Sequence, residues 1–248
     1  MRKRTEPSAA LSDADHAFAR SLVIAEDAHL IAFNKPAGLA VQGGSGVTRS
    51  LEDLLAAFAK SNGKRPRLVH RLDRETSGVI IAARTKPAAA FLSQAFASRD
   101  ARKKYTAIVC GGAPDPAEGE IALALRKSSR AGLDIMEISA DGQVALTRYR
   151  TRAATPAAAL VELAPETGRM HQLRAHMAAI GRPIAGDSKY GGLFRIGAVE
   201  TPQLLLHAAA LDIPHPDGGR RLFTAPEPAH FVAPRTSLGL EQPVQTQT

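Results

Sequence analysis

The sequence predicts an α+β fold with a mixed, largely antiparallel sheet and flanking helices. Many short apolar segments rich in β-branched residues are separated by Gly and Pro, a pattern typical of strands joined by turns. Only three segments, 50–60, 85–98 and 171–180, show convincing helical signals. A chain of 248 residues is long enough to bury a full hydrophobic core, and we expect one main domain over residues 21–233.

The composition indicates a basic protein that binds a polyanion. Lys and Arg total 32 against 24 acidic residues, which gives a formal charge of +8 and a pI near 10.0. Nucleic acid is the simplest partner for such a surplus, and an anionic membrane surface is the competing one. No apolar run is long enough to span a membrane. The single cysteine, Cys110, forms no internal disulfide and lies in an apolar run. We expect a cytoplasmic location.

The two ends of the chain are polar. Residues 1–20 have little apolar periodicity and are expected to form a mobile basic arm, and residues 234–248 a disordered polar tail. Two short strands, 22–24 and 30–33, follow the arm and lead into the turn Asn34–Gly38. Lys35 in that turn either faces a phosphate or is simply solvated. The Gly-rich loop that follows lacks the Lys-Ser or Lys-Thr ending of a P-loop.

Each of the three predicted helices has a recognisable beginning or end. Ser50 can cap the first, which has a leucine-rich stripe. Thr85 and Pro87 open the second, whose Phe91, Leu92 and Phe96 are expected to point inward. The third, His171 to Ile180, stops at Gly181. Arg174 lies on this otherwise apolar helix, where a buried guanidinium needs a partner.

A charged loop precedes the most apolar strand of the chain. Gly78–Ala83 reads as a strand buried on both faces, so the loop carrying Arg71, Asp73, Arg74 and Glu75 must emerge at the edge of the core. A carboxylate held among arginines is biased toward its ionised form. Taken alone, such a residue is more often part of a structural salt bridge than a catalytic group.

The remaining segments predict short strands joined by turns and loops. A basic run ends at Lys104, and Tyr105 begins the next strand; an aromatic beside basic residues can stack on a base, although a strand tyrosine more often packs on the core. Segment 126–130 reads as a basic loop. The other expected strands or short apolar elements are 120–125, 134–138, 144–151, 158–163, 204–211 and 221–225.

Three motifs resemble those of the RluA family of pseudouridine synthases. His70–Gly78 reads His-Arg-Leu-Asp-x-x-Thr-Ser-Gly, like the signature loop of that family. Asn34–Gly38 resembles its N-terminal motif and Thr167–His176 its later one, and the resemblance runs from about residue 22 to residue 231. It implies a pseudouridine-synthase-like fold, with residues 21–233 as the catalytic domain.

The resemblance also implies roles for particular residues. Asp73 is the catalytic carboxylate, Arg174 its charge partner, and Tyr105 stacks on the uracil and assists removal of the C5 proton. Arg71 fills the gap left by a flipped base, and Leu206 helps to wall the uracil pocket. The same motifs suggest further substrate-binding residues, which are His70, Arg169, His171 and Lys35. The reaction requires no metal or other cofactor, and His171 and His176 lack zinc-ligand spacing.

Two other functions compete with this one. A non-catalytic RNA-binding or ribosome-assembly protein could use the same scaffold, but the set of Asp73, Tyr105 and Arg174 argues against it. A glycosidase-like hydrolase needs a second carboxylate, and none stands out beyond Glu75. For the substrate, the segments 41–46 and 74–78 look most similar to those of family members that act on large-subunit rRNA. We therefore expect 23S rRNA, with tRNA as the alternative. We expect a monomer that contacts RNA and no membrane, with no obligate protein partner.

Overall fold

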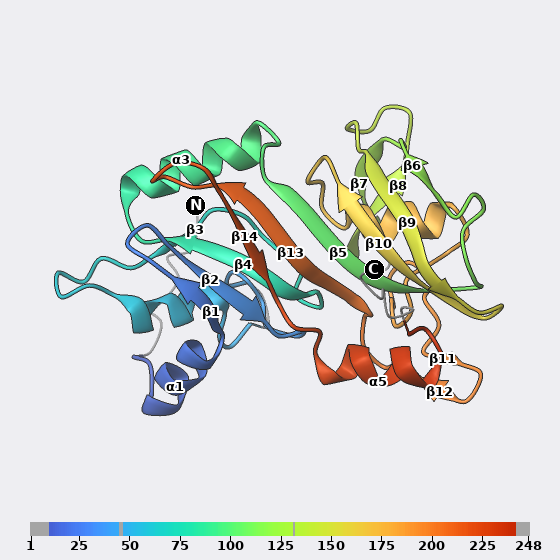
Figure 1. The fold of residues 1–248 in the computed structure, drawn as a ribbon, viewed down its shortest axis with the longest axis horizontal. Helices are drawn as coiled ribbons and strands as arrows, with labels where there is room; N and C mark the ends of the chain where they lie inside the picture. Colours follow the sequence, from blue (N-terminus) through green and yellow to red (C-terminus); the bar gives the residue numbers. More distant parts are fainter. Residues whose placement is uncertain (1–9, 45–46, 131, 242–248) are drawn as a thin grey trace, which may run out of the picture.

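The protein folds around one large sheet with helices on both faces. The computed structural model describes residues 10–44, 47–130 and 132–241 (Figure 1). The predicted α+β class and the mixed, largely antiparallel sheet are confirmed. In chain order the elements are α1 (Asp13–Ser21), β1 (Val23–Glu26), β2 (Leu30–Lys35), α2 (Leu51–Leu54), the 3₁₀ helix η1 (Leu55–Phe58), β3 (Arg67–Leu68), β4 (Ser77–Ala83), α3 (Lys86–Ala97), β5 (Arg102–Cys110), β6 (Glu118–Ile121), β7 (Leu125–Arg130), β8 (Leu133–Ile138), β9 (Thr147–Ala154), β10 (Ala158–Pro165), α4 (Gln172–Ala179), β11 (Arg195–Ile196), β12 (Val199–Glu200), β13 (Leu206–Pro214), β14 (Arg220–Thr224) and α5 (Ala229–Ser237).

The order of the strands places a late strand at the centre of the sheet. The strands lie in the order β1-β2-β4-β13-β5-β10-β9-β6, with β3 added beside β4 and β14 beside β13. β13 therefore separates β4 from β5, which follow one another in sequence (Figure 1). It runs parallel to β4, pairing His207 with Ser77 and Ala208 with Gly78, and antiparallel to β5.

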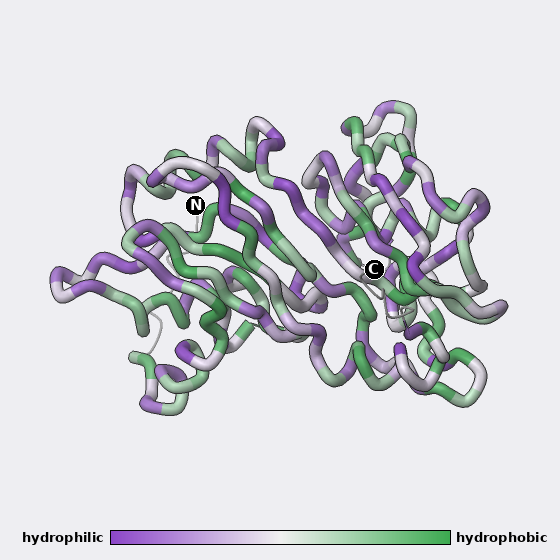
Figure 2. Tube along the Cα trace, viewed as in Figure 1, coloured by the Kyte–Doolittle hydropathy of each residue, from purple (hydrophilic) through white to green (hydrophobic). Residues whose placement is uncertain are grey.

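Alternating side chains of the central strands build a core on each face of the sheet. In the half that contains β2 and β4, Ile80 packs toward α2 and η1, whereas Ile81 packs toward α3. In the half that contains β5 and β10, Val109 packs with residues of α4, whereas Ile108 packs with Phe231 of α5. Figure 2 shows the resulting apolar character of the central strands. The helices thus cover both faces of the sheet.

β4 is buried along its whole length, as the sequence predicts. All seven of its residues are buried, and Gly78 adopts a φ of +111° where the strand meets β13. A β-carbon at Gly78 would lie 2.2 Å from the carbonyl oxygen of Ala208. Glycine is required there both by the backbone conformation and by the close approach of β13.

The N-terminal prediction is wrong for residues 13–20. These residues belong to α1, which begins with a capping box: the Ser12 hydroxyl accepts from the Asp15 amide at 3.1 Å, and the Asp15 carboxylate accepts from the Ser12 amide at 2.9 Å. Ala19 is buried against the core beside Leu22. The rest of the predicted arm, residues 1–9, lies outside the described residues.

The predicted disordered tail is also wrong for its first residues. Pro234 and Arg235 lie within α5, and Arg235 forms an ion pair with Glu227 at 2.8 Å. Leu240 is fully buried against Phe231. The folded unit therefore extends past the predicted boundary at residue 233, and residues 242–248 lie outside the described residues.

Three local expectations need correction. The described chain contains five α-helices, not three, and the first predicted helix is a single α turn, α2, followed by η1. Segment 126–130, predicted as a loop, is strand β7 and pairs with β8. Phe91 of α3 is 42% exposed, whereas Leu92 is fully buried, because the core faces only one stripe of this helix.

The contact between β4 and β13 gives a test of this architecture. Gly78→Ala should lower the free energy of unfolding by several kcal/mol, about 3 or more, because the left-handed backbone and the clash with Ala208 both oppose a side chain. Urea denaturation measures this change. Gly43→Ala is the matched control, since nothing lies within 4 Å of a β-carbon at Gly43. Equal stability of the two variants would show that β13 does not approach Gly78 this closely.

Candidate active site

The loop before β4 and the segment before α4 meet around a cavity of about 550 Å³. The loop between β3 and β4 contributes Asp73, whose side chain is 26% exposed. The segment 165–169 and the first turn of α4 line the opposite side. Two predicted residues complete the walls: Tyr105 from β5 is half-buried and Leu206 from β13 is buried. The structure therefore brings Asp73, Tyr105, Arg174 and Leu206 together.

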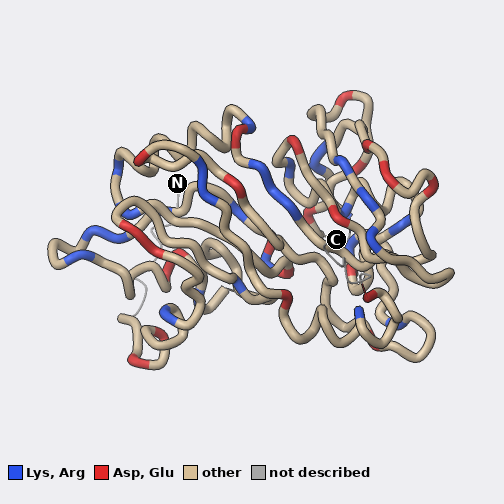
Figure 3. The backbone as a smooth tube through the Cα atoms, in the orientation of Figure 1, with Lys and Arg blue, Asp and Glu red and all other residues tan. Residues whose placement is uncertain are grey.

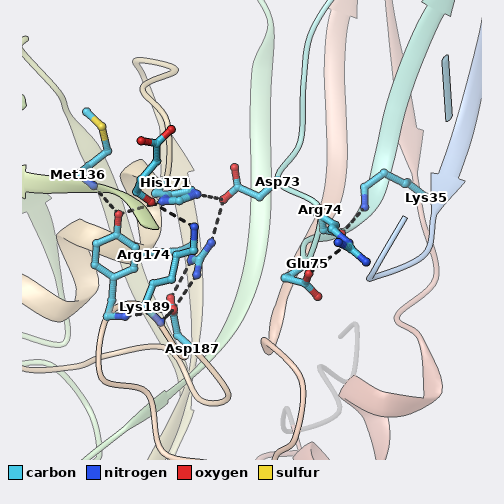
Figure 4. Close-up of polar contacts among 11 residues, drawn as sticks. Lys35, Asp73, Arg74, Glu75, Met136, His171, Arg174, Asp187 and Lys189 are labelled. Atoms are coloured by element: carbon cyan, nitrogen blue, oxygen red, sulfur yellow. Dashed lines mark hydrogen bonds and ion pairs between the residues drawn. The ribbon is translucent and has the colours of Figure 1, made fainter. Parts of the chain in front are cut away.

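Arg174 is the charge partner of Asp73, as the sequence predicts, but it has a second and closer partner. Its Nη1 lies 3.5 Å from Oδ2 of Asp73. Its Nε and Nη2 donate to the two carboxylate oxygens of Asp187 at 2.8 and 2.7 Å (Figure 4). Burial alone would lower the pKa of Arg174, but the hydrogen bonds and charge of Asp187 outweigh it and raise that pKa. The bidentate pair fixes the plane of the guanidinium and leaves one nitrogen for Asp73.

Asp187 is the site residue that the sequence reasoning missed. It lies in the glycine-rich loop after α4 and is fully buried. Its Oδ1 also accepts from the backbone amides of Lys189 and Tyr190 at 3.0 and 3.2 Å, which is an Asx-turn arrangement. The sequence Gly186-Asp187, followed by Gly191-Gly192, indicates such a turn, but nothing in the sequence connects that turn with Arg174.

His171 lies beside Asp73 in a strained backbone conformation. It precedes α4 with a φ of +50°, and its Nε2 is 4.0 Å from Oδ2 of Asp73. Its Nδ1 contacts the Tyr190 hydroxyl at 2.9 Å, and that hydroxyl already accepts from the Met136 amide at 2.7 Å. A hydroxyl that accepts from Met136 is free to donate to Nδ1, which leaves a proton on Nε2 facing Asp73. Burial lowers the pKa of His171 and so favours this neutral form.

Tyr105 forms the wall between the two halves of the core. It packs against the cluster under α2 and also against the cluster under α4. Burial, followed by the negative charge of Asp73, raises the pKa of the Tyr105 hydroxyl well above its usual value. The phenol is therefore neutral at physiological pH, and any part it takes in proton transfer must begin from the protonated hydroxyl.

His70, Arg71 and Arg169 also line the cavity. Arg71 is exposed at the rim, and Nε of Arg169 donates to the carbonyl of Val144 at 3.2 Å. His70 has a largely structural setting: its Nε2 accepts from the Ile81 amide at 3.0 Å, and its ring stacks on Phe96 at 4.4 Å between centroids. Burial, and then the charge of a nearby lysine, lowers the pKa of His70 to about 3, so the ring is neutral.

Lys35 does not bind a substrate from this position, and neither expectation for it is right. Its side chain is fully buried, and its Nζ donates to the carbonyls of Pro36, Leu39 and Arg74 at 2.9, 2.9 and 3.0 Å. Burial lowers the pKa of Lys35 to about 7. Lys35 ties the turn after β2 to the loop that carries Asp73, and Figure 4 shows it on the far side of Arg74 and Glu75 from Asp73.

Within the described residues, no group of three His, Cys, Asp or Glu side chains is placed to hold a metal ion. None of the helices in the described ranges is long and apolar enough to cross a membrane.

Comparison with known proteins defines the class to which this fold and site belong. The family model described as RNA pseudouridylate synthase matches residues 29–179, a range that contains all three motifs noted in the sequence. The chain belongs to this family of enzymes. The resemblance drawn from the motifs is therefore confirmed.

Particular relatives agree with this assignment. The chain is 37% identical over 220 residues to the mitochondrial pseudouridylate synthase RPUSD4 of Xenopus tropicalis, covering 79% of this chain and 68% of that protein. It is 35% identical over 204 residues to ribosomal large subunit pseudouridine synthase C of Escherichia coli K12, covering 80% of this chain and 63% of the relative. The structure of human RNA pseudouridylate synthase domain containing 4 superposes with a TM-score of 0.79 at 30% identity, covering 93% of this chain and 98% of that one.

The pair formed by Arg174 and Asp187 gives a test of how the site is held. Asp187→Asn keeps the shape but removes the charge, so we expect it to lower the free energy of unfolding by about 3 kcal/mol. Chemical denaturation at neutral pH measures the loss. Glu120→Gln is the control, because its pair with Arg148 at 2.8 Å is exposed and such pairs contribute at most about 1 kcal/mol. Equal losses in the two variants would contradict a supporting role for Asp187.

Proposed function

We propose that this protein converts uridine within an RNA chain to pseudouridine in the cavity around Asp73. The observation that carries the proposal is the Asp73 carboxylate, which is partly exposed to the cavity and held by Arg174 at 3.5 Å. The reaction is an isomerisation: the N1–C1′ bond breaks, the uracil turns, C5 bonds to C1′, and the C5 proton is replaced by one on N1. It needs a carboxylate at the sugar and a pocket for the base, and it consumes no metal or redox cofactor.

Each wall of the cavity has a part in this reaction. A uracil cannot react while it is stacked in a helix, so it must flip into the pocket, at a cost of about a few kcal/mol. Tyr105 and Leu206 then contact the ring, and Arg71 at the rim occupies the space that the base has left. Asp73 acts at the sugar, as a nucleophile on C1′ or as a base, and both roles use the same ionised carboxylate. His171 and Arg174 hold that carboxylate toward the cavity.

Tyr105 begins the reaction as a neutral phenol. For it to take the C5 proton, its own hydroxyl proton must leave, and the Asp73 carboxylate is the acceptor in the cavity. We propose this relay: the C5–H bond breaks toward the Tyr105 oxygen while the phenolic proton passes to Asp73, and Asp73 then returns a proton to N1 of the uracil. The aromatic ring meanwhile stacks on the uracil, as the sequence suggests.

For the RNA target we propose 23S rRNA, with tRNA as the alternative. Relatives from Escherichia coli and Rickettsia bellii are named ribosomal large subunit pseudouridine synthase C. The chain spans 63% and 56% of the lengths of those two relatives, so their substrates do not transfer automatically. The amino-acid sequence of the motifs also resembles that of the family members that act on rRNA. We further propose a monomer located in the cytoplasm with the RNA; the relatives from Xenopus and Arabidopsis are named mitochondrial.

Asp73→Asn should abolish pseudouridine formation while RNA affinity changes little. The amide keeps the shape of the carboxylate but can neither attack the sugar nor accept a proton. The measurement is the pseudouridine content of transcribed 23S rRNA and of total tRNA after incubation with each enzyme. Glu75→Gln is the control, because Glu75 is an exposed acid of the same loop and pairs with Arg74 at 3.7 Å. Normal turnover by Asp73→Asn would exclude Asp73 as the catalytic residue.

Tyr105→Phe should keep the fold and RNA affinity but slow single-turnover product formation by about a hundredfold, the usual size of proton-transfer assistance. The relay starts from the neutral phenol, so the wild-type rate should not rise between pH 7 and 9 as it would for a phenolate base. An unchanged rate in the Phe variant would leave Tyr105 with stacking alone.

A further inference from the structure

The basic run before Tyr105 divides between the two faces of β5. Arg102 and Lys104 point away from the cavity and pair with Asp212 at 3.6 Å and Glu162 at 3.2 Å. Lys103 lies between them, so its side chain projects to the opposite face and lines the cavity together with Tyr105. Figure 3 shows the run of Lys and Arg along the first part of β5. Only one of these three cations therefore faces the base pocket.

Arg99 joins Lys103 at the same end of the cavity. It follows α3 with a φ of +63°, and among the described non-glycine residues only Arg99 and His171 have a positive φ. Both line the cavity. A side chain in the left-handed region costs about 1 to 3 kcal/mol, and such positions cluster at functional sites. Glycine would satisfy the same turn without strain, so an arginine there adds a cation at a cost in stability.

These two cations have no acidic partner within the described part of the chain. Nζ of Lys103 donates to the carbonyl of Thr167 at 3.2 Å, and Asp100, the acid next to Arg99 in the sequence, pairs with Arg220 at 2.8 Å. The acids nearest in the cavity wall are engaged: Glu166 pairs with Arg148 at 3.0 Å and Asp73 with Arg174. Burial, and then the charge of Arg99, lowers the pKa of Lys103 to about 8. The two groups destabilise one another unless an anion lies between them.

We propose that Arg99 and Lys103 form a phosphate subsite for the RNA backbone next to the flipped uridine. This inference rests on the proposed function and deepens it. A uracil is neutral and would leave the two positive charges uncompensated, whereas a phosphodiester oxygen can accept from both side chains at once. The neutral ring of His70, stacked on Phe96, forms the wall between this subsite and the core. The subsite thus holds the backbone while Tyr105 and Leu206 hold the base.

The test compares neighbouring lysines that face opposite sides of one strand. Binding of transcribed 23S rRNA and of total tRNA is measured in the Asp73→Asn background, where no reaction occurs, over a range of KCl concentrations. Lys103→Met should weaken binding about tenfold and lower the slope of the salt dependence by about one. Lys104→Met should change both far less, and Lys103→Arg should retain most of the affinity.

Arg99→Gly separates the ligand role from a structural one. The variant should bind RNA about tenfold more weakly, yet unfold at the same or a higher temperature, because glycine relieves the left-handed strain. Equal losses for Lys103→Met and Lys104→Met, or unchanged affinity in Arg99→Gly, would overturn the subsite. Pseudouridine formation by the otherwise wild-type enzyme is assayed in parallel. If it fails while the binding differences remain, the proposed function falls and the phosphate subsite stands.

Discussion

The buried pair between Arg174 and Asp187 is the interaction on which the rest of the site depends. A guanidinium removed from water is costly unless its nitrogens are satisfied, and the two bonds of 2.7 and 2.8 Å to Asp187 provide this. With those nitrogens engaged, Nη1 remains for Asp73, which lies 101 residues earlier in the chain. One side chain therefore joins α4, the loop that follows it and the loop before β4. Loss of the pair would free all three segments together.

The sequence indicated Asp73 better than it indicated the residues that support it. Asp73 and Arg174 could be paired in advance because the family resemblance names Asp73 as the partner that Arg174 needs on an apolar helix. Asp187 could not, because the turn that buries it is defined by backbone contacts between segments that are remote in sequence. The prediction for Lys35 was wrong for the same reason. Its partners are three backbone carbonyl oxygens, and the types of residue in a sequence do not show where carbonyl groups lie in the fold.

Most of the fold followed from patterns of apolar residues, and the longest wrongly predicted segments lie at the ends of the chain. Gly78–Ala83 was readable as a buried strand because every side chain in it is apolar or small. Helix α1 was missed although Ser12 and Asp15 have the spacing of a capping box. The helix contains too few apolar residues to show a clear helical periodicity in the sequence. On β5, alternation separates Lys103 from Lys104, but only the neighbouring strands decide which of the two faces the cavity.

The position of β13 has a consequence for the order in which the protein becomes complete during synthesis. β4 and β5 leave the ribosome early, but the strand that fills the space between them begins at Leu206. Until that segment emerges, each half of the sheet presents an open edge with unpaired backbone groups, a state prone to mispairing. The last wall of the pocket arrives with the same strand. The loop that carries Asp73 is therefore made well before the strand that completes the cavity around it.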